Sequence, residues 1–365
     1  MKISGFEVNS VRIQADNPLV AGVKGSDATR GFVTLELYTD EGVTGIGVSF
    51  IPGNVSNPLY PSLKLAVENL AELLVGEDPL QIENLYAKLM LASTGSGPGG
   101  ILNIAMTSID TALWDIKGKF LNQSVSSLLG GYRTSINTYA SGQLGREKNL
   151  EDLEYIAPRL VELGFNQMKT QMGGELTASA EIQRMKILRE VLSPDIDLMC
   201  DINQLWDVNQ AIQIGSRVEQ YNLFWLEDVV ACEDYQGLAR VADALTTPIC
   251  AGEYVYGIKP FRHMIEARSI DIVMIDLMRV GGITQFMKVA HMAEAFNLPV
   301  VSHLIPEVQV HTMSAIPNGL TVEYMPWSLE LFVETPAIEN GQIVVPNKPG
   351  LGLEFNQDVI NKFKE

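Results

Sequence analysis

The chain has 365 residues, of which 46% are hydrophobic and 19% are charged, a composition typical of a globular protein with an ample core. Its formal net charge is −18, and a surface of that sign repels nucleic acids and anionic membranes, so we exclude both as partners. An anionic small molecule would need cations inside its binding pocket.

The compartment is indicated by the amino terminus and the cysteines. The first residues alternate like a strand and lack a signal-peptide pattern, and no apolar run reaches the roughly 18 residues of a membrane span. Cys200, Cys232 and Cys250 are odd in number and lack CxxC spacing, which favours free thiols. We predict a soluble, cytoplasmic protein.

Residues 1–130 are predicted to form an α+β domain. Segments 6–13 and 31–50 alternate apolar and polar residues, as strands do, with a hairpin turn at 40–42. Segments 62–76 and 78–91 carry apolar residues at helical spacing, and a further helix begins near residue 101.

From residue 135 the pattern changes to alternating strands and helices. Strands are predicted for eight apolar segments, at 136–140, 166–171, 195–201, 222–227, 247–253, 271–276, 297–303 and 319–324. Eight such units predict a closed parallel (β/α) barrel of the α/β class, with its active residues at the carboxyl ends of the strands. We expect the barrel domain to span residues 131–326 and residues 327–365 to pack back on the first domain.

Three acidic residues, Asp201, Glu227 and Glu253, each close one of the predicted strands. Carboxylates at the ends of successive barrel strands converge at one rim, where mutual repulsion would protonate one of them in the absence of a cation. Hard oxygen ligands in this arrangement suit Mg²⁺. The sequence therefore predicts a Mg²⁺ site at the barrel rim.

One histidine is placed to act in chemistry. His303 ends a predicted strand, whereas His263, His291 and His311 lie in helical patterns and are interpreted as surface or packing residues. Asp276 ends the preceding strand and can accept the second ring proton of His303. We predict that this pair works as an acid/base dyad.

Six segments, in order and spacing, resemble the mandelate racemase subgroup of the enolase superfamily: AMTSIDTALWDIKGK, LMCDINQLWD, LFWLEDV, ICAGE, IDLMRVGGIT and VSHLIPEVQVH. The resemblance covers essentially the whole chain. It implies an enolase-type modified TIM barrel with an N-terminal capping domain, and Mg²⁺ on the three carboxylates binding a substrate carboxylate. It also implies the His303–Asp276 dyad, and Glu323 as a protonated donor to the other carboxylate oxygen.

The resemblance further implies that two capping loops, at 15–30 and near 50–58, supply substrate specificity. Within them Lys24 and Arg30 are candidate carboxylate contacts. A contact from either would indicate a diacid substrate, and otherwise a monoacid is expected. Lys169 is the cation predicted to receive an anionic substrate. Relatives tend to assemble, so we expect a homo-oligomer.

The second strand departs from the family pattern. The subgroup carries Lys-x-Lys there, and this chain has Lys169 followed by Gln171, which cannot exchange protons. Racemisation needs an acid/base group on each face of the planar intermediate, whereas dehydration can use one residue to remove the α-proton and to protonate the departing β-hydroxyl. The sequence therefore predicts a Mg²⁺-dependent dehydratase (hydro-lyase) that works through an enediolate.

Polar residues such as Gln171 and Asn203 suit a polyhydroxylated substrate, so the dehydratase is expected to act on an acid sugar. Two alternatives stay open. Lys169 could serve as the opposite-face base of a racemase or epimerase. A barrel that binds a metal and a carboxylate without turnover is the non-enzymatic alternative.

Overall fold

A computed structural model describes residues 1–53 and 55–365. The chain begins with an antiparallel sheet of β1 (Ile3–Gln14), β2 (Thr29–Thr39) and β3 (Thr44–Ser49). Four helices follow, namely α1 (Tyr60–Glu72), α2 (Ile82–Ala92), α3 (Ile101–Leu121) and α4 (Val125–Leu129). This confirms the α+β character predicted for the first part of the chain.

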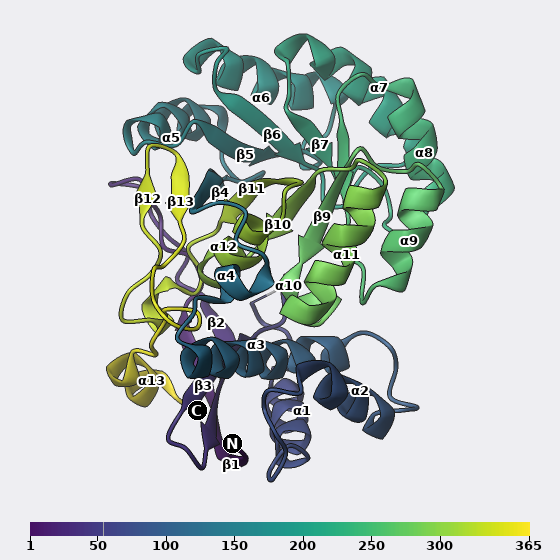
Figure 1. The fold of residues 1–365 in the computed structure, drawn as a ribbon. Coiled ribbons are helices and arrows are strands. Elements are labelled where there is room, and N and C mark those ends of the chain that lie inside the picture. The colour runs from purple at the N-terminus through teal and green to yellow at the C-terminus, as the bar shows by residue number, and fades with distance from the viewer. Residues whose placement is uncertain (54) are drawn as a thin grey trace.

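Helix α3 lies between the small sheet and the barrel, and Figure 1 shows it running beneath the barrel with β3 on its other side. Most of its residues are buried, because both of its faces are covered. The sheet approaches α3 closely at Gly47, where an added Cβ would lie 1.9 Å from the carbonyl oxygen of Ser108. A side chain at this position would push the two elements apart.

The barrel is closed and parallel. Neighbouring strands pair in chain order and β11 returns to β4. The strands are β4 (Ser135–Leu144), β5 (Gln167–Gln171), β6 (Asp197–Asp201), β7 (Trp225–Glu227), β8 (Ile249–Ala251), β9 (Ile272–Asp276), β10 (Val300–His303) and β11 (Gly319–Tyr324). The predicted enolase-type (β/α) barrel is confirmed.

Helices alternate with the strands and surround the barrel. They are α5 (Leu150–Glu162), α6 (Ala178–Val191), α7 (Val208–Val218), α8 (Tyr235–Ala244), α9 (Lys259–Glu266), α10 (Leu277–Val280), α11 (Ile283–Ala295) and α12 (Pro306–Ala315). Side-chain caps fix several of their starts. Asn149 and Asp207, for example, both form reciprocal capping boxes with the third helical residue.

A layer of buried side chains supports the rim from inside the barrel. Met199, Trp225, Met274 and Val301 belong to one apolar cluster with Tyr139, and each of the four lies two residues before an acid or a histidine at the rim. Because alternate residues of a strand face the same side, the rim residues point into the barrel as well. The interior is packed below them, so these polar groups open only toward the carboxyl ends.

The last segment contacts both parts of the molecule. Its strands β12 (Ile338–Glu339) and β13 (Gln342–Val344) form a hairpin, and β13 pairs with β4 of the barrel. Helix α13 (Gln357–Phe363) contacts β1, and Lys364 forms a β-bridge with Val11. The domain boundaries at residues 130 and 326 stay a prediction.

The cysteines and the helix lengths were also predicted from the sequence. The three cysteines are free, as predicted. In the described part of the chain, no helix has the length and apolar character required to cross a bilayer.

Candidate active site

A cavity of about 420 Å³ lies at the carboxyl ends of the barrel strands. Its floor is formed by rim residues of the barrel, including Lys169, Asp201 and His303. Asp16 and Arg30, from the N-terminal part of the chain, contribute to its wall. The cavity is therefore enclosed by residues from both parts of the fold.

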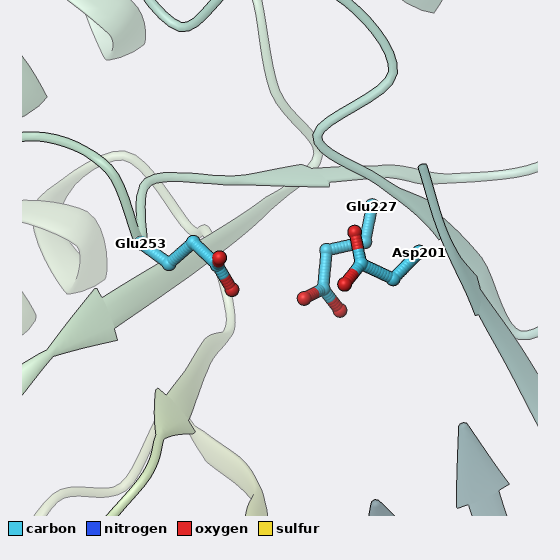
Figure 2. Close-up of side chains that lie close together, drawn as sticks. All are labelled: Asp201, Glu227 and Glu253. Atoms are coloured by element: carbon cyan, nitrogen blue, oxygen red, sulfur yellow. The ribbon is translucent and has the colours of Figure 1, made fainter. Parts of the chain in front are cut away.

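The three predicted metal ligands come together at the strand ends, where Asp201 and Glu253 line the cavity and Glu227 lies beside them. Asp201, Glu227 and Glu253 are buried, and one oxygen from each lies within 4.8 Å of the others (Figure 2). Asp201 and Glu227 end adjacent strands in direct register. Glu253 lies two residues beyond the end of β8 rather than within a strand. Three hard, anionic oxygen donors at this spacing fit a divalent cation such as Mg²⁺.

Hydrogen bonds orient these carboxylates. Asp201 accepts from the backbone N–H of Asn203 and from its side-chain Nδ2, both at 2.7 Å. Glu227 accepts from Trp225 Nε1 at 2.9 Å and contacts Lys169 Nζ at 2.6 Å. The ligand oxygens are thus held in place by groups outside the trio, which is how proteins preorganise a metal site.

The electrostatics of the trio reflect burial of like charges. Burial raises the pKa of Asp201 to about 6 and also raises the pKa of Glu227 well above its usual value. Burial acts in the same direction on Glu253, but the charges of His303 and Lys169 outweigh it and lower that pKa. Ionising all three carboxylates together is unfavourable without additional positive charge.

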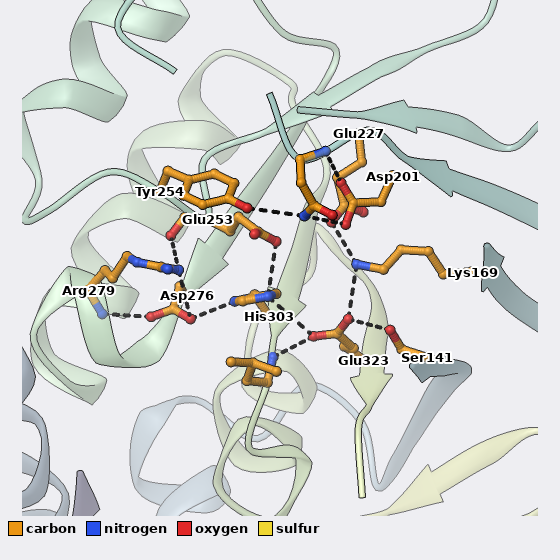
Figure 3. Close-up of polar contacts among 12 residues, drawn as sticks. Ser141, Lys169, Asp201, Glu227, Glu253, Tyr254, Asp276, Arg279, His303 and Glu323 are labelled. Carbon is orange, nitrogen blue, oxygen red and sulfur yellow. Dashed lines mark hydrogen bonds and ion pairs between the residues drawn. The ribbon is translucent and has the colours of Figure 1, made fainter. Parts of the chain in front are cut away.

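The predicted acid/base pair is formed. His303 Nδ1 lies 2.6 Å from Asp276 Oδ2, and the two residues are register partners on β10 and β9 (Figure 3). Asp276 also accepts a 2.6 Å hydrogen bond from the backbone N–H of Arg279, and Arg279 Nη1 donates to the carbonyl oxygen of Glu253 at 2.8 Å. The ring orientation is therefore fixed by two rigid strands.

The other ring nitrogen of His303 faces the carboxylates. Nε2 lies 3.0 Å from Glu253 Oε2 and 3.8 Å from Glu323 Oε2. Burial acts to lower the pKa of His303, but Glu253, Glu323 and Asp276 together raise it well above the usual value. The charge on this histidine therefore depends on the state of the carboxylates around it.

Glu323 and Lys169 form an ion pair next to Glu227, on the side of His303 away from Asp276. Lys169 Nζ lies 3.0 Å from Glu323 Oε1 and contacts Glu227 as well (Figure 3). Glu323 also accepts from Ser141 Oγ and from the backbone N–H of Leu304, both at 2.7 Å. Burial acts to raise the pKa of Glu323, but the charges of Lys169 and His303 outweigh it and lower that pKa. The role of Glu323 as a protonated donor to the substrate stays a prediction.

The two predicted polar contacts also reach the cavity. Gln171 Nε2 donates to Asn203 Oδ1 at 3.0 Å, and Arg146 Nη2 donates to the same oxygen. Asn203 Nδ2 donates in turn to the hydroxyl of Tyr254 at 3.1 Å. A left-handed backbone, with φ of 49°, turns Asn203 back toward the strand ends. Gln171 and Asn203 therefore form one hydrogen-bonded wall.

The two predicted capping-loop cations differ. Arg30 lies in the cavity wall, with its guanidinium 3.5 Å from the centre of the Trp327 ring. Lys24 lies in a neighbouring hollow, where its side chain is 83% exposed and pairs with Asp27. The structure does not bring Lys24 into the main cavity, because the loop carrying it extends toward solvent.

Several site residues were not predicted from the sequence. Ser141 follows the predicted strand 136–140, but β4 continues to Leu144 and so carries Ser141 to the rim. Tyr254 follows Glu253 directly and lines the cavity. Asp16 accepts from Trp327 Nε1 across 311 positions of sequence, a contact that no local pattern indicates.

Fold and site together define a class of protein: a (β/α) barrel enzyme with a cap over the strand ends, three converging carboxylates and a histidine–aspartate dyad. Two family models match the chain, the N-terminal domain of mandelate racemase / muconate lactonizing enzyme at residues 6–130 and the enolase C-terminal domain-like model at residues 152–359. The chain belongs to the mandelate racemase / muconate lactonizing enzyme family of the enolase superfamily, which confirms the resemblance seen in the sequence.

Named relatives extend the comparison. The chain is 30% identical to L-talarate/galactarate dehydratase of Salmonella typhimurium, over 89% of this chain and 80% of the relative. It is also 30% identical to arabinonate dehydratase of Saccharolobus solfataricus, over 91% and 90% of the two chains. The crystal structure of L-talarate dehydratase from Polaromonas sp. JS666, complexed with Mg and L-glucarate, superposes with a TM-score of 0.87 at 30% identity, over 99% of this chain and 98% of that one.

Proposed function

We propose that this protein is a Mg²⁺-dependent dehydratase that eliminates water from an acid-sugar carboxylate. The observation that carries the proposal is the single histidine–aspartate dyad on the cavity floor, combined with Gln171 where a second base would be needed. Relatives named as dehydratases of talarate, galactarate and arabinonate support this chemistry.

Asp201, Glu227 and Glu253 are the residues that would hold Mg²⁺. A divalent cation bound there would stabilise the negative charge that develops on the substrate carboxylate as the α-proton leaves. Lys169, between Glu227 and Glu323, supplies a further positive charge on the same side of the cavity. These residues bind and orient the reacting end of the substrate.

His303 moves the proton. Its Nε2 removes the α-proton from the substrate, while Asp276 holds Nδ1–H and stabilises the charged ring. The same ring then protonates the β-hydroxyl as the C–O bond breaks, so one water leaves and an enol remains, which ketonises to a 2-keto acid. Glu253 contributes strongly to the raised pKa of His303, so a cation held by Glu253 would offset that contribution and favour the neutral ring that a base requires.

A racemase or epimerase is the second candidate, and the position of Lys169 favours it. The Lys169 amine reaches the cavity and could contact the other face of the substrate. However, it is paired with Glu227 and Glu323 at 2.6 and 3.0 Å, and those contacts hold it as a fixed cation. The dehydratase therefore fits the geometry better.

The test is incubation of the Mg²⁺-loaded protein with a panel of aldonates and aldarates in D₂O, followed by mass spectrometry and NMR. The expected result is a 2-keto product that lacks one water, with turnover lowered about 10²- to 10⁴-fold in His303→Asn. Inverted substrate without loss of water would overturn the dehydratase in favour of the epimerase. A Lys169→Met variant that still exchanges the α-proton at full rate would exclude Lys169 as a base.

We also propose that the protein is cytoplasmic and assembles as a homo-oligomer. We propose domain boundaries that give a capping domain at 1–130, a barrel domain at 131–326 and a C-terminal segment at 327–365 that packs back on the capping domain. The free thiols of Cys200 and Cys250, both buried in barrel strands, support a reducing compartment. Light scattering on the purified protein measures the number of subunits, and a monomer at micromolar concentration would contradict the assembly.

A further inference from the structure

Arg30 is a buried cation with unused hydrogen-bonding capacity. It lies near the start of β2, only 4% of its surface is exposed, and its side chain lines the cavity. Nη1 donates one hydrogen bond, to the carbonyl oxygen of Gly53 at 3.0 Å. Within residues 1–53 and 55–365, Nε has no hydrogen-bond partner and no carboxylate oxygen lies within 4 Å of the guanidinium. A buried charge in this state is costly unless something completes its contacts.

The other cationic groups of the cavity differ from Arg30 in this respect. Lys169 lies within 3.0 Å of both Glu227 and Glu323. The Arg279 guanidinium lies 3.7 Å from Asp276, and His303 pairs with the same carboxylate. Among the described residues that line the cavity, Arg30 is therefore the cation whose charge is not matched by a carboxylate in contact.

The described surroundings of Arg30 hold it in place without forming an ion pair with it. Its guanidinium stacks on the Trp327 ring at 3.5 Å, a cation–π contact that fixes the plane of the group. Trp327 Nε1 is tied in turn to Asp16 at 3.0 Å, and Asp16 remains beyond ion-pair distance of Arg30. Burial lowers the pKa of Arg30 to about 10 although the charge of Asp16 acts to raise it, and the guanidinium stays charged at neutral pH.

We propose that Arg30 binds a second carboxylate at the distal end of the substrate, so that the enzyme acts on sugar diacids (aldarates). The proposal rests on the proposed function and names its substrate class. The reactive carboxylate belongs at the barrel floor with Asp201, Glu227 and Glu253, whereas Arg30 comes from the capping sheet on a different wall of the same cavity. A planar guanidinium with free N–H groups matches a carboxylate, and an uncharged hydroxymethyl end would leave its charge unpaired.

The carboxylates near Arg30 fit the same assignment. Asp16 and Glu147 line the cavity and can accept hydrogen bonds from hydroxyl groups along the sugar chain. Because Asp16 acts on Arg30 only from beyond ion-pair distance, Arg30 is the group on this wall that can still pair with a distal carboxylate. An aldarate therefore satisfies the whole cavity, whereas an aldonate leaves the Arg30 end unmatched.

The test compares each aldarate with the aldonate of the same configuration, using kcat/KM of the Mg²⁺-loaded enzyme and its Arg30→Gln variant. We expect the wild type to prefer the diacid. Arg30→Gln should lower kcat/KM for the diacid roughly 10- to 100-fold, the value of a charge-assisted hydrogen bond, and change the aldonate less than about threefold. Arg30→Lys keeps the charge, so its kcat/KM for the diacid should lie between those of the wild type and Arg30→Gln. Lys24→Gln is the matched control, since that exposed lysine lies outside the cavity, and it should leave both substrates unchanged.

The outcomes separate this inference from the proposed function. Dehydration of aldonates at least as efficient as that of aldarates, with Arg30→Gln affecting both alike, would overturn the diacid assignment and leave the dehydratase standing. If no acid is turned over, the proposed function fails, and calorimetric binding of an aldarate and its aldonate to the wild type and Arg30→Gln still tests Arg30. If Arg30→Gln is less stable than the wild type and cannot be assayed, Arg30→Lys takes its place. A ratio of kcat/KM for the aldarate to that for the aldonate equal to the wild-type ratio would then overturn the diacid assignment, and a lower ratio would support it.

Discussion

The stereochemical outcome at this site depends on residues His303 and Gln171. His303 is locked by Asp276 at 2.6 Å, and Gln171 is part of the amide wall with Asn203. An amide cannot take or return a proton, so the wall positions the substrate while the dyad does the acid/base work. One titratable face is sufficient for elimination and insufficient for inversion.

Restoring a base at position 171 should therefore change the reaction. We expect Gln171→Lys to exchange the α-proton from the second face, producing the epimer and deuterium in recovered substrate. Nearby positive charge on Lys169 and Arg146 would lower the pKa of the new lysine and make it a better base. NMR of recovered substrate in D₂O measures this.

Gln171→Met is the matched control for that experiment. It removes the same hydrogen bonds but adds no titratable group, so it should slow dehydration without giving the epimer. If folded, dehydrating Gln171→Lys showed no more exchange than the wild type, the role assigned to position 171 would be wrong.

The sequence predicted those site residues whose position follows from the local pattern of apolar and polar residues. Asp201, Glu227 and His303 each end an apolar strand, so the parallel barrel places them together. Arg30 was predicted as a candidate, but its isolation from carboxylates depends on tertiary packing. The expected role of Lys24 was not supported, because a charged loop residue in sequence gives no sign of which way its loop extends. Ser141 was missed because the predicted strand 136–140 stopped four residues before the end of β4 at Leu144.

At the scale of elements, α3 fastens the capping part to the barrel segment that follows Asp276. Thr107 Oγ1 donates to the carbonyl oxygen of Leu277 at 3.0 Å, and Trp114 Nε1 donates to Thr284 Oγ1 at 2.9 Å. Asp110 accepts from the backbone N–H of Thr284 at 2.8 Å, while its other oxygen is buried and lacks a partner among the described residues. This helix therefore helps to position the segment that directly follows Asp276 at the end of β9.

Asp110 should make the stability of this junction depend on pH. Burial raises its pKa from 3.8 to about 7, so folding favours the protonated form. Its contribution to the free energy of unfolding therefore falls as pH rises from about 4 to about 7 and is constant above, with a slope of about 1.4 kcal/mol per unit inside that window. Asp110→Asn should remove this component, so that the loss of stability between pH 5 and pH 8 shrinks by on the order of 2 kcal/mol.

Urea unfolding at the two pH values measures this difference. Glu154→Gln, on the exposed face of α5, is the control and should follow the wild type at both. An Asp110→Asn variant with the same pH dependence as the wild type would contradict the assignment.

The alternation of elements was readable from the sequence, because buried parallel strands are continuous apolar runs and their helices carry periodic faces. The residues at which the strands begin and end were predicted less accurately. The predicted strand 247–253 is reduced to Ile249–Ala251, since the left-handed Gly252 turns the chain before Glu253. The contact of β13 with β4 could not be predicted, because it joins segments some two hundred positions apart.

At the scale of the whole molecule, an acidic protein of net charge −18 folds around a floor of buried carboxylates. Lys169 and His303 offset part of that charge, but the raised pKa values of Asp201 and Glu227 show that compensation is incomplete. The carboxylates that would hold a cation for catalysis therefore repel one another and destabilise the fold when no cation is bound. Stability and activity should respond together to the metal.

Mg²⁺ should therefore raise the melting temperature. A ligand that binds only the folded state adds about 2.7 kcal/mol to the free energy of unfolding at 100 times its Kd. The shift should be larger at pH 8 than at pH 5, because Asp201, whose pKa is raised to about 6, must lose its proton to act as a ligand. Asp201→Asn should abolish most of the shift, whereas Glu147→Gln, which lies in the cavity but outside the trio, should keep it. Calorimetry with and without chelator measures all three proteins, and identical melting curves for the folded wild type at pH 8 with and without Mg²⁺ would show that the three carboxylates do not bind the ion.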